Sequence, residues 1–190
     1  MKGIVGILLA AGAGRRFGSE KLLHPLASGG LMGMEAARNL ITAIPGSLAV
    51  IRPGDQDLAD RFAALGLHVV ENPEAVRGMG LSLAAGVTAA ADAAGWLVAL
   101  ADMPWIRPQT IVSLTNELRQ GASLVAPVHQ GRRGHPVGFN RKWRSRLQAL
   151  TGDQGARALL ADHSSELTLQ ATADPGVLLD VDRQVDLHRL

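Results

Sequence analysis

The residues best suited to chemistry lie in a glycine-rich segment near the start of the chain. The apolar residues 4–11 lead directly into residues 12–21, which contain three glycines, two arginines and a lysine. Glycines let backbone N–H groups approach an anion without obstruction by Cβ atoms. Arginine and lysine neutralise phosphate oxygens. A buried strand opening into such a loop is typical of a polyphosphate-binding segment.

Two familiar phosphate-binding loops do not fit this segment. A P-loop needs G-x-x-x-x-G-K-[ST], whereas Gly18 is followed by Ser19 and Glu20. A dinucleotide-binding G-x-G-x-x-G loop needs its third glycine where Phe17 stands. Two other interpretations stay open: a secretory signal peptide, which the two arginines after a short apolar stretch disfavour, and an ordinary strand and turn with solvated arginines.

A carboxylate follows a second apolar run. Asp102 comes directly after residues 96–101, and Pro104 prevents the strand from continuing. Hard oxygen donors suit Mg²⁺, which binds one or two carboxylates together with substrate phosphates. The alternative is that Asp102 only caps a turn. Asp180 and Asp182 follow the last apolar segment and present the same choice between a metal site and a helix cap.

Three further glycine-containing segments carry polar residues. In residues 77–83, the glycines permit close approach of a ligand, and Ser82 either caps a helix or hydrogen-bonds a base or ribose. Residues 134–139 and 152–157 are glycine-bounded turns with a histidine, an aspartate and an arginine. No spacing of serine, histidine and aspartate predicts a hydrolase triad.

Composition excludes several classes of protein. The chain of 190 residues has no cysteine, which rules out disulfides, thiolate metal sites and cysteine nucleophiles. Aromatic residues make up only 3%, and the basic residues form no long run, so we expect no nucleic-acid partner. Charges or glycines interrupt every apolar stretch before it reaches membrane-spanning length. We therefore expect a cytoplasmic protein with no membrane partner.

The arrangement of apolar and amphipathic segments predicts the elements that position these residues. Strand-like runs alternate with helical patterns, which indicates a mostly parallel sheet covered on both faces. Ligands of such sheets bind at the carboxyl ends of the strands, where residues 12–21 and Asp102 lie. The expected strands are residues 4–10, 47–51, 68–71, 96–101, 123–128, 135–139, 166–171 and 177–181, and the expected helices are residues 34–43, 56–65, 81–93, 109–119, 141–150 and 155–163.

Several motifs together resemble a known family. Residues 9–21 fit L-A-A-G-x-[SG]-x-R-[MF]-G-x-x-K, and the elements G-M-G-x-S-L, L-A-D-M-P, G-H-P-V-x-F, G-D-x-G-A-R and D-V-D-x-x-x-D-L follow in order. This pattern resembles the MobA-like and MocA-like nucleotidyltransferases of molybdenum cofactor biosynthesis, with the cytidylyltransferases as the nearest branch. Phe17 and Gly14 depart from the commonest residues, and residues 27–33 lack the family's G-[KR]-P-[LM] element.

The resemblance implies a single Rossmann-like, three-layer α/β domain of the nucleotide-diphospho-sugar transferase type. Residues 1–105 would form its nucleotide-binding half and residues 106–190 its acceptor-binding half. The implied reaction is Mg²⁺-dependent transfer of CMP from CTP to the phosphate of molybdopterin, with release of pyrophosphate. A molybdoenzyme or its maturation factor would be a further partner.

The resemblance also assigns roles to individual residues. It implies that the catalytic residues are Arg16, Lys21 and Asp102. The nucleotide would be bound by Leu9, Ala10, Ala11, Gly12, Gly14, Arg16, Gly18, Lys21, Gly80, Ser82 and Asp102. The acceptor would be bound by His135, Pro136, Asp153 and Arg157. Asp102 with Asp182, or failing that with Asp180, would hold Mg²⁺.

Two groups of alternatives remain. One is a guanylyltransferase or another sugar-phosphate or small-molecule nucleotidyltransferase, although Leu9-Ala10-Ala11-Gly12, without a Gly-Gly pair, resembles the cytidylyl branch. The other is a non-catalytic nucleotide-binding partner of a molybdoenzyme. We also expect Asp102 and Asp182 to converge within about 8 Å, because both follow apolar strands whose carboxyl ends share one sheet edge.

Overall fold

The structure is a computed structural model that describes residues 2–12, 17, 20–153 and 155–188. Within this part, eight strands form one sheet: β1 (Lys2–Leu9), β2 (Leu48–Ile51), β3 (His68–Glu71), β4 (Ala93–Leu100), β5 (Leu124–His129), β6 (Arg132–Arg133), β7 (Val137–Asn140) and β8 (Leu167–Ala171). The α-helices are α1 (Met32–Ala43), α2 (Gln56–Ala64), α3 (Met79–Ala89), α4 (Pro108–Arg119), α5 (Arg144–Gln148) and α6 (Arg157–Asp162).

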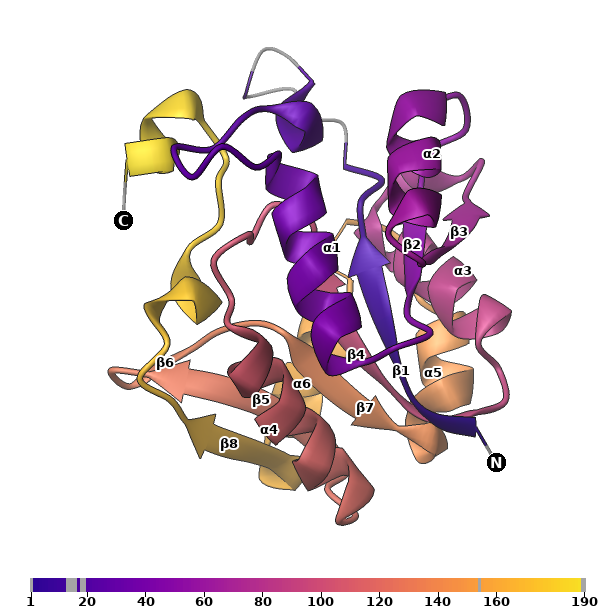
Figure 1. Ribbon diagram of the computed structural model, residues 1–190. Helices are drawn as coiled ribbons and strands as arrows, with labels where there is room; N and C mark the ends of the chain where they lie inside the picture. The colour runs from indigo at the N-terminus through magenta and orange to yellow at the C-terminus, as the bar shows by residue number, and fades with distance from the viewer. Residues whose placement is uncertain (1, 13–16, 18–19, 154, 189–190) are drawn as a thin grey trace.

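The sheet has a parallel part and a mixed part (Figure 1). Strands β3, β2, β1 and β4 lie side by side in that order, and each pair is parallel. Strand β7 then pairs antiparallel with both β4 and β5. Strand β5 also pairs antiparallel with β6 and parallel with β8. All four strands of the parallel part therefore end at the same edge.

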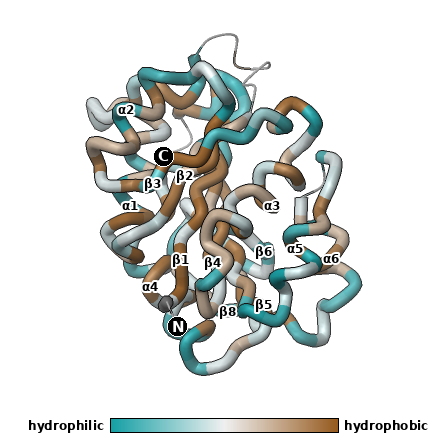
Figure 2. Tube along the Cα trace, turned by 90° about the vertical axis from the view of Figure 1, so that its right-hand side faces the viewer, coloured by the Kyte–Doolittle hydropathy of each residue, from teal (hydrophilic) through white to brown (hydrophobic). Residues whose placement is uncertain are grey.

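Helices cover both faces of the sheet, which makes three layers (Figures 1 and 2). On one face, α1, α2 and α4 bury apolar side chains such as Leu40, Phe62 and Leu114. On the other face, α3, α5 and α6 do the same with side chains such as Val87 and Leu147. The strands between them carry the most hydrophobic part of the chain in Figure 2. Because both faces are covered, β1 is a nearly continuous apolar run rather than an alternating one.

The expected fold class is confirmed, with two corrections to the elements. The helix expected over residues 81–93 ends at Ala89, and β4 begins at Ala93, which pairs with Lys2 of β1. Pairing along the full length of β1 overrides the helix propensity of the alanines there. The Trp96 indole also donates a hydrogen bond to the Ala90 carbonyl at 3.1 Å, which fixes the turn between α3 and β4.

The second correction concerns the strand expected over residues 177–181. Here the chain forms a 3₁₀ turn, Pro175–Leu178, and no β-strand. Pro175 lacks a backbone N–H for a sheet, and the buried Asp174 carboxylate accepts from Gly176 N at 3.0 Å, which closes the turn. A second 3₁₀ segment, Gln184–His188, follows. Within the described residues, no helix is long and apolar enough to cross a membrane.

Candidate functional site

A hollow of about 420 Å³ opens at the carboxyl edge of the parallel strands. The segments that follow β1, β2, β3 and β4 all contribute to its wall. Backbone hydrogen bonds from Ala10 N to Val50 O at 2.9 Å and from Ala101 N to Leu9 O at 3.1 Å extend the strand pairing up to its floor. The lining residues are Leu9, Ala10, Ala11, Gly12, Lys21, Leu22, Arg52, Ala75, Val76, Gly78, Met79, Ser82, Leu100, Asp102 and Asp153.

The charged centre of this site is a lysine between two carboxylates. Lys21 Nζ donates to Asp102 Oδ2 at 2.7 Å and lies 3.6 Å from Asp182 Oδ1. The Lys21 side chain is 11% exposed and that of Asp102 26%, whereas that of Asp182 is 48% exposed, so solvent weakens the attraction to Asp102 less than the attraction to Asp182. The two carboxylate oxygens are separated by no more than the sum of these distances, which is inside the expected limit of about 8 Å.

Asp182 reaches Asp102 by a route that differs from the expected one. Residues 177–181 do not form a neighbouring strand; instead Val181 N donates to Asp102 O at 3.0 Å. The Val181 side chain is fully buried in a small apolar cluster with Phe17, Leu26 and Met32. This hydrogen bond and this buried side chain anchor the segment before Asp182 beside β4. Asp180, by contrast, is exposed.

The same carboxylate pair fits a divalent cation. The ammonium of Lys21 shows that the space between Asp102 and Asp182 accommodates a positive charge. Carboxylate oxygens are the donors that Mg²⁺ prefers. Among the described residues, no group of three or more histidine, aspartate or glutamate side chains gathers to hold a metal. A metal here would therefore need oxygen ligands from substrate phosphate and water as well.

The glycines before α3 pack against another loop. Gly78 has φ 135°, and a Cβ atom there would meet the carbonyl carbon of Gly152 at 2.3 Å. Gly80 N donates to Gly152 O at 2.9 Å, and a Cβ on Gly80 would come within 2.8 Å of Thr151 O. These glycines thus allow close approach of the loop that carries Asp153 into the hollow. Gly80 itself does not line the hollow.

Ser82 lies in the hollow but does not cap a helix. Helix α3 is preceded by Gly78 at its N-cap position, without a side-chain cap. The buried Ser82 hydroxyl instead accepts a hydrogen bond from Asn72 Nδ2 at 3.3 Å. Asn72 in turn accepts from Glu74 N at 3.1 Å. This polar chain fixes the segment between β3 and α3.

His135 lies close to the carboxylates without lining the hollow. Its backbone N donates to Val177 O at 2.9 Å, and its Nδ1 is buried without a hydrogen-bond partner among the described residues. Burial lowers the pKa of the imidazole below 6.5, the neighbouring charges of Asp102 and Asp180 oppose that shift, and Arg133 adds to it. Burial therefore favours the neutral form of the ring near Asp102.

The remaining expected residues are dispersed. Pro136 is buried beside His135, outside the lining. Arg157 is exposed at the first residue of α6 and is not among the lining residues. Gly14, Arg16 and Gly18 lie outside the residues that the structure describes, so their expected roles remain predictions.

Arg52 lines the hollow, and we did not predict it. It follows β2 directly, so the strand-end reasoning applied to Asp102 was sufficient to find it. Its guanidinium is held by Asp55, with Nε and Nη2 at 3.1 Å and 3.0 Å from Oδ2. Arg52 and Lys21 also line an adjoining hollow of about 200 Å³ that extends toward the start of α2.

A mostly parallel sheet with a charged hollow at its carboxyl edge defines the class of α/β proteins that bind phosphorylated ligands at strand ends. The sequence pattern of the MobA-like NTP transferase domain matches residues 6–167, and the chain belongs to that family. The resemblance noted from the motifs is thereby confirmed at the level of the family.

Two relatives match nearly the whole chain. Nicotine blue oxidoreductase of Paenarthrobacter nicotinovorans is 31% identical over 98% of this chain and 96% of its own length. Purine catabolism protein PucB of Bacillus subtilis (strain 168) is 30% identical over 94% of this chain and 91% of its own length. One name states an oxidoreductase activity and the other a part in purine catabolism, so kinship with these proteins assigns no substrate to this chain.

Among solved structures, Rv0371c of Mycobacterium tuberculosis H37Rv has a TM-score of 0.85 and 24% identity, covering 99% of this chain and 97% of that chain. The same mycobacterial protein is also known as a complex with manganese, with a TM-score of 0.82 and 23% identity over 98% and 97% of the two chains. At these identities, the likeness shows a shared fold.

Proposed function

We propose that this protein transfers CMP from CTP to the phosphate of molybdopterin, with release of pyrophosphate, in a reaction that depends on Mg²⁺. The observation that carries the proposal is the cluster of Lys21, Asp102 and Asp182 at the edge of the hollow. It combines a cation for phosphate oxygens with carboxylates for a metal. Membership of the MobA-like family supports nucleotidyl transfer as the reaction type.

The proposed reaction is an in-line displacement. An oxygen of the acceptor phosphate attacks the α-phosphorus of CTP and forms a new P–O bond. The bond from that phosphorus to the oxygen bridging the α- and β-phosphates breaks, and pyrophosphate leaves with the electron pair. The protein needs to supply little covalent chemistry, so positioning and neutralisation of charge account for catalysis.

Different groups of the protein would bind the triphosphate, the metal and the acceptor. Backbone N–H groups of the loop after β1, together with Lys21 and Arg16, hold the triphosphate. Asp102 and Asp182 would hold Mg²⁺, which, when bound, neutralises charge that develops on the phosphate oxygens. His135, Pro136, Asp153 and Arg157 are proposed to contact the acceptor. Asp153 has the strongest support among these because it lines the same hollow as Lys21.

Pyrophosphate release tests the proposal. The purified protein is incubated with Mg²⁺, each of CTP, GTP, ATP and UTP, and either molybdopterin or a sugar phosphate as the acceptor, and the product is identified by mass spectrometry. We expect pyrophosphate and a cytosine dinucleotide with CTP. Release with GTP instead would place the protein in the guanylyl branch, and release only with a sugar phosphate would change the acceptor.

A non-catalytic protein would give a different pattern. If no nucleotide gave pyrophosphate with any of these acceptors, catalysis would be rejected. A thermal shift with CTP and Mg²⁺ would then still report nucleotide binding, because a ligand that binds the native state raises its apparent stability. The two measurements together separate an enzyme from a nucleotide-binding partner.

A further inference from the structure

Arg52 and Asp102 line the hollow from the ends of different strands. The order of the parallel strands is β3-β2-β1-β4. Asp102 follows β4 and Lys21 belongs to the loop after β1, whereas Arg52 follows β2 and residues 75–82 follow β3. Of the described residues that line the hollow, Lys21 and Arg52 are the two cations, and they stand at different strands.

This strand order indicates how a nucleotide would be oriented in the hollow. In the proposed function, the triphosphate and metal occupy the side of β1 and β4. In a nucleoside triphosphate, the base and the γ-phosphate lie at opposite ends of the molecule. Its base therefore extends toward β2 and β3, where the wall is formed by Arg52, Ala75, Val76, Met79 and Ser82.

Asp55 fixes the guanidinium of Arg52 in a way that leaves donors for hydrogen bonds to a nucleobase. Asp55 accepts from the side of the guanidinium that carries Nε and Nη2, with the longest of the three contacts at 3.4 Å. The Arg52 side chain is 36% exposed, so this pairing is partly shielded from solvent. A guanidinium has a second fork, formed by Nη1 and Nη2, that can donate to two adjacent acceptors.

We infer that Arg52 is a specificity-determining residue that recognises the nucleobase through a pair of adjacent acceptors. Cytosine offers such a pair at O2 and N3, and guanine offers one at O6 and N7. Uracil separates its acceptors with the N3–H donor, and adenine places its amino donor beside each of N1 and N7. Arg52 thus favours CTP or GTP over UTP and ATP. This inference rests on the proposed function, because that function sets the direction of the nucleotide.

Equilibrium binding of the four triphosphates with Mg²⁺ tests the inference. The wild-type protein, Arg52→Lys and Asp55→Asn are compared. Lysine keeps the charge but loses the fork, so we expect the preference for CTP or GTP over UTP to fall by roughly 5–150-fold. Affinity for UTP should stay nearly unchanged. Asp55→Asn should lower the same preference by a smaller factor, because it loosens the guanidinium without removing it.

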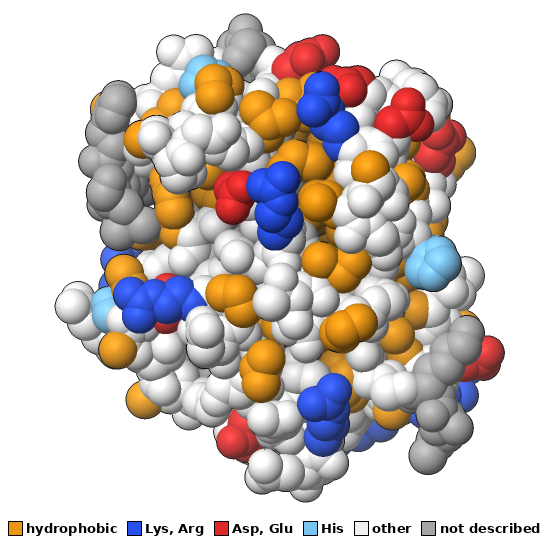
Figure 3. Space-filling model, in the orientation of Figure 1, with side chains coloured by type: hydrophobic (Ala, Val, Ile, Leu, Met, Phe, Trp, Pro, Cys, Tyr) orange, Lys and Arg blue, Asp and Glu red, His pale blue; other side chains and the backbone are white. Residues whose placement is uncertain are grey.

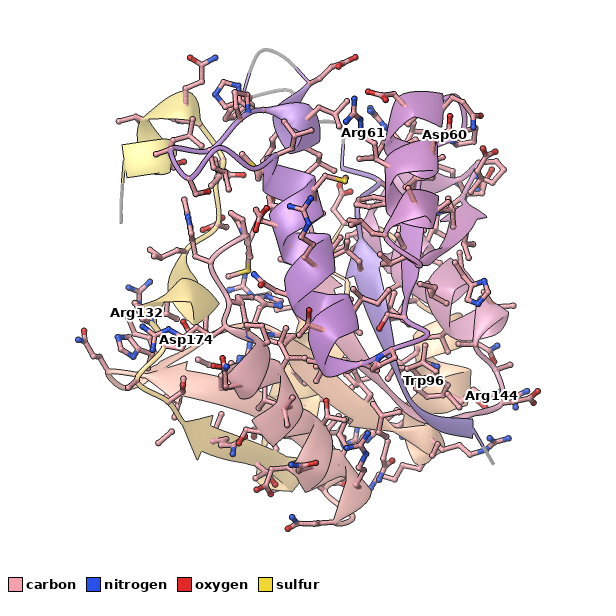
Figure 4. All side chains as sticks on the ribbon, viewed as in Figure 1. Asp60, Arg61, Trp96, Arg132, Arg144 and Asp174 are labelled. Carbon is pink, nitrogen blue, oxygen red and sulfur yellow. The ribbon has the colours of Figure 1, made fainter. Side chains whose placement is uncertain are left out.

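Arg61→Lys provides a matched control. Arg61 is an exposed residue of α2, labelled in Figure 4, whose Nε donates to Asp57 Oδ1 at 2.8 Å. It forms the same kind of arginine–aspartate pair without lining the hollow, so this variant should keep the wild-type preference. Thermal unfolding of all variants checks that each one folds.

The outcomes separate the inference from the proposed function. Equal weakening of all four nucleotides by Arg52→Lys would make Arg52 a phosphate contact and overturn base recognition. An unchanged preference would overturn it too, even if pyrophosphate release confirmed the proposed function. Absence of nucleotide binding by the wild-type protein would overturn both. Loss of preference together with an absence of pyrophosphate release would support base recognition and reject only catalysis.

Discussion

The parallel and mixed parts of the sheet differ in how they assemble a site. In the parallel part, residues directly after β1, β2 and β4 meet in one hollow, and among them are Gly12, Arg52 and Asp102. In the mixed part, Asp153 lines the hollow, but Arg157 is exposed at the start of α6 and His135 lies outside the lining.

The difference follows from strand direction. Parallel strands present all their carboxyl ends at one edge, so a residue's position in the sequence indicates its position in space. Beside β4, strand β7 runs antiparallel, and that rule no longer applies. There the loops are placed by individual contacts, such as Gly80 with Gly152 and His135 with Val177. We therefore expect substitutions in the first part to affect nucleotide chemistry most directly.

Asp102→Asn should have the largest effect. It removes one carboxylate charge while keeping the shape of the side chain. We expect Mg²⁺-dependent pyrophosphate release to fall by at least about 100-fold, because charge stabilisation in the transition state is lost. Thermal unfolding should change little, since Asp102 is partly exposed.

Asp60→Asn is the matched control for this prediction. Asp60 is an exposed residue of α2, labelled in Figure 4, that accepts from Gln56 Nε2 at 2.7 Å and does not line the hollow. This variant should release pyrophosphate at the wild-type rate. Comparable activity of the Asp102 and Asp60 variants would contradict the assignment of the metal to the end of β4.

Lys21→Met should have the next largest effect. Loss of a charge-assisted contact of about 1.5–3 kcal/mol should weaken CTP binding by roughly 10–150-fold. In the nucleotide-free protein, Mn²⁺ binding measured by electron paramagnetic resonance should become tighter, because the ammonium no longer neutralises Asp102 and Asp182.

Lys142→Met serves as its control. Lys142 forms an ion pair with Glu166 next to α5, far from the strand ends that form the hollow. The Lys142→Met substitution removes one positive charge, as Lys21→Met does, but it should alter neither CTP binding nor Mn²⁺ binding. Unchanged Mn²⁺ affinity in the Lys21 variant would show that the ammonium does not compete with the metal.

His135→Asn, in the mixed part of the sheet, should have the smallest effect, which is a change in how stability depends on pH. Because burial lowers the pKa of His135, the folded protein binds fewer protons there than the unfolded chain does. Above pH 6.5, the pKa of histidine in the unfolded chain, His135 costs the folded protein no stability. As the pH falls below 6.5 toward the lower pKa of the folded state, protonation of the unfolded chain reduces the free energy of unfolding.

Thermal unfolding at a series of pH values checks this sign. Between about pH 7.5 and 5, the unfolding temperature of His135→Asn should decline less than that of the wild type. CTP affinity should remain unchanged, because His135 does not line the hollow. An equal decline in both proteins would show that His135 does not contribute to acid sensitivity.

The sequence predicts elements that depend on local patterns better than it predicts contacts between distant parts of the chain. Helix α4 was predicted within one residue, since its apolar periodicity matches its buried face, and strand β3 was predicted with its exact bounds. The convergence of Asp102 and Asp182 was expected, but for the wrong reason, because residues 177–181 are not a strand. A hydrogen bond from Val181 to Asp102 is a tertiary contact with no local sequence signal.

The surface bears on the expected absence of a nucleic-acid partner. On the face seen in Figure 3, lysine and arginine side chains are scattered among acidic, hydrophobic and uncharged ones rather than gathered in a stripe. A basic stripe is the usual footprint of a phosphate backbone. Among the described residues that line the hollow, the two cations, Lys21 and Arg52, follow different strands.

The position of Lys21 has a thermodynamic consequence. Its ammonium pairs with two carboxylates in the nucleotide-free protein, and in the proposed reaction it pairs with triphosphate oxygens instead. The affinities for metal and for nucleotide are then linked: the factor by which nucleotide raises metal affinity is also the factor by which metal raises nucleotide affinity. Partial loading with either ligand alone is disfavoured, and the two occupancies rise together as their concentrations increase.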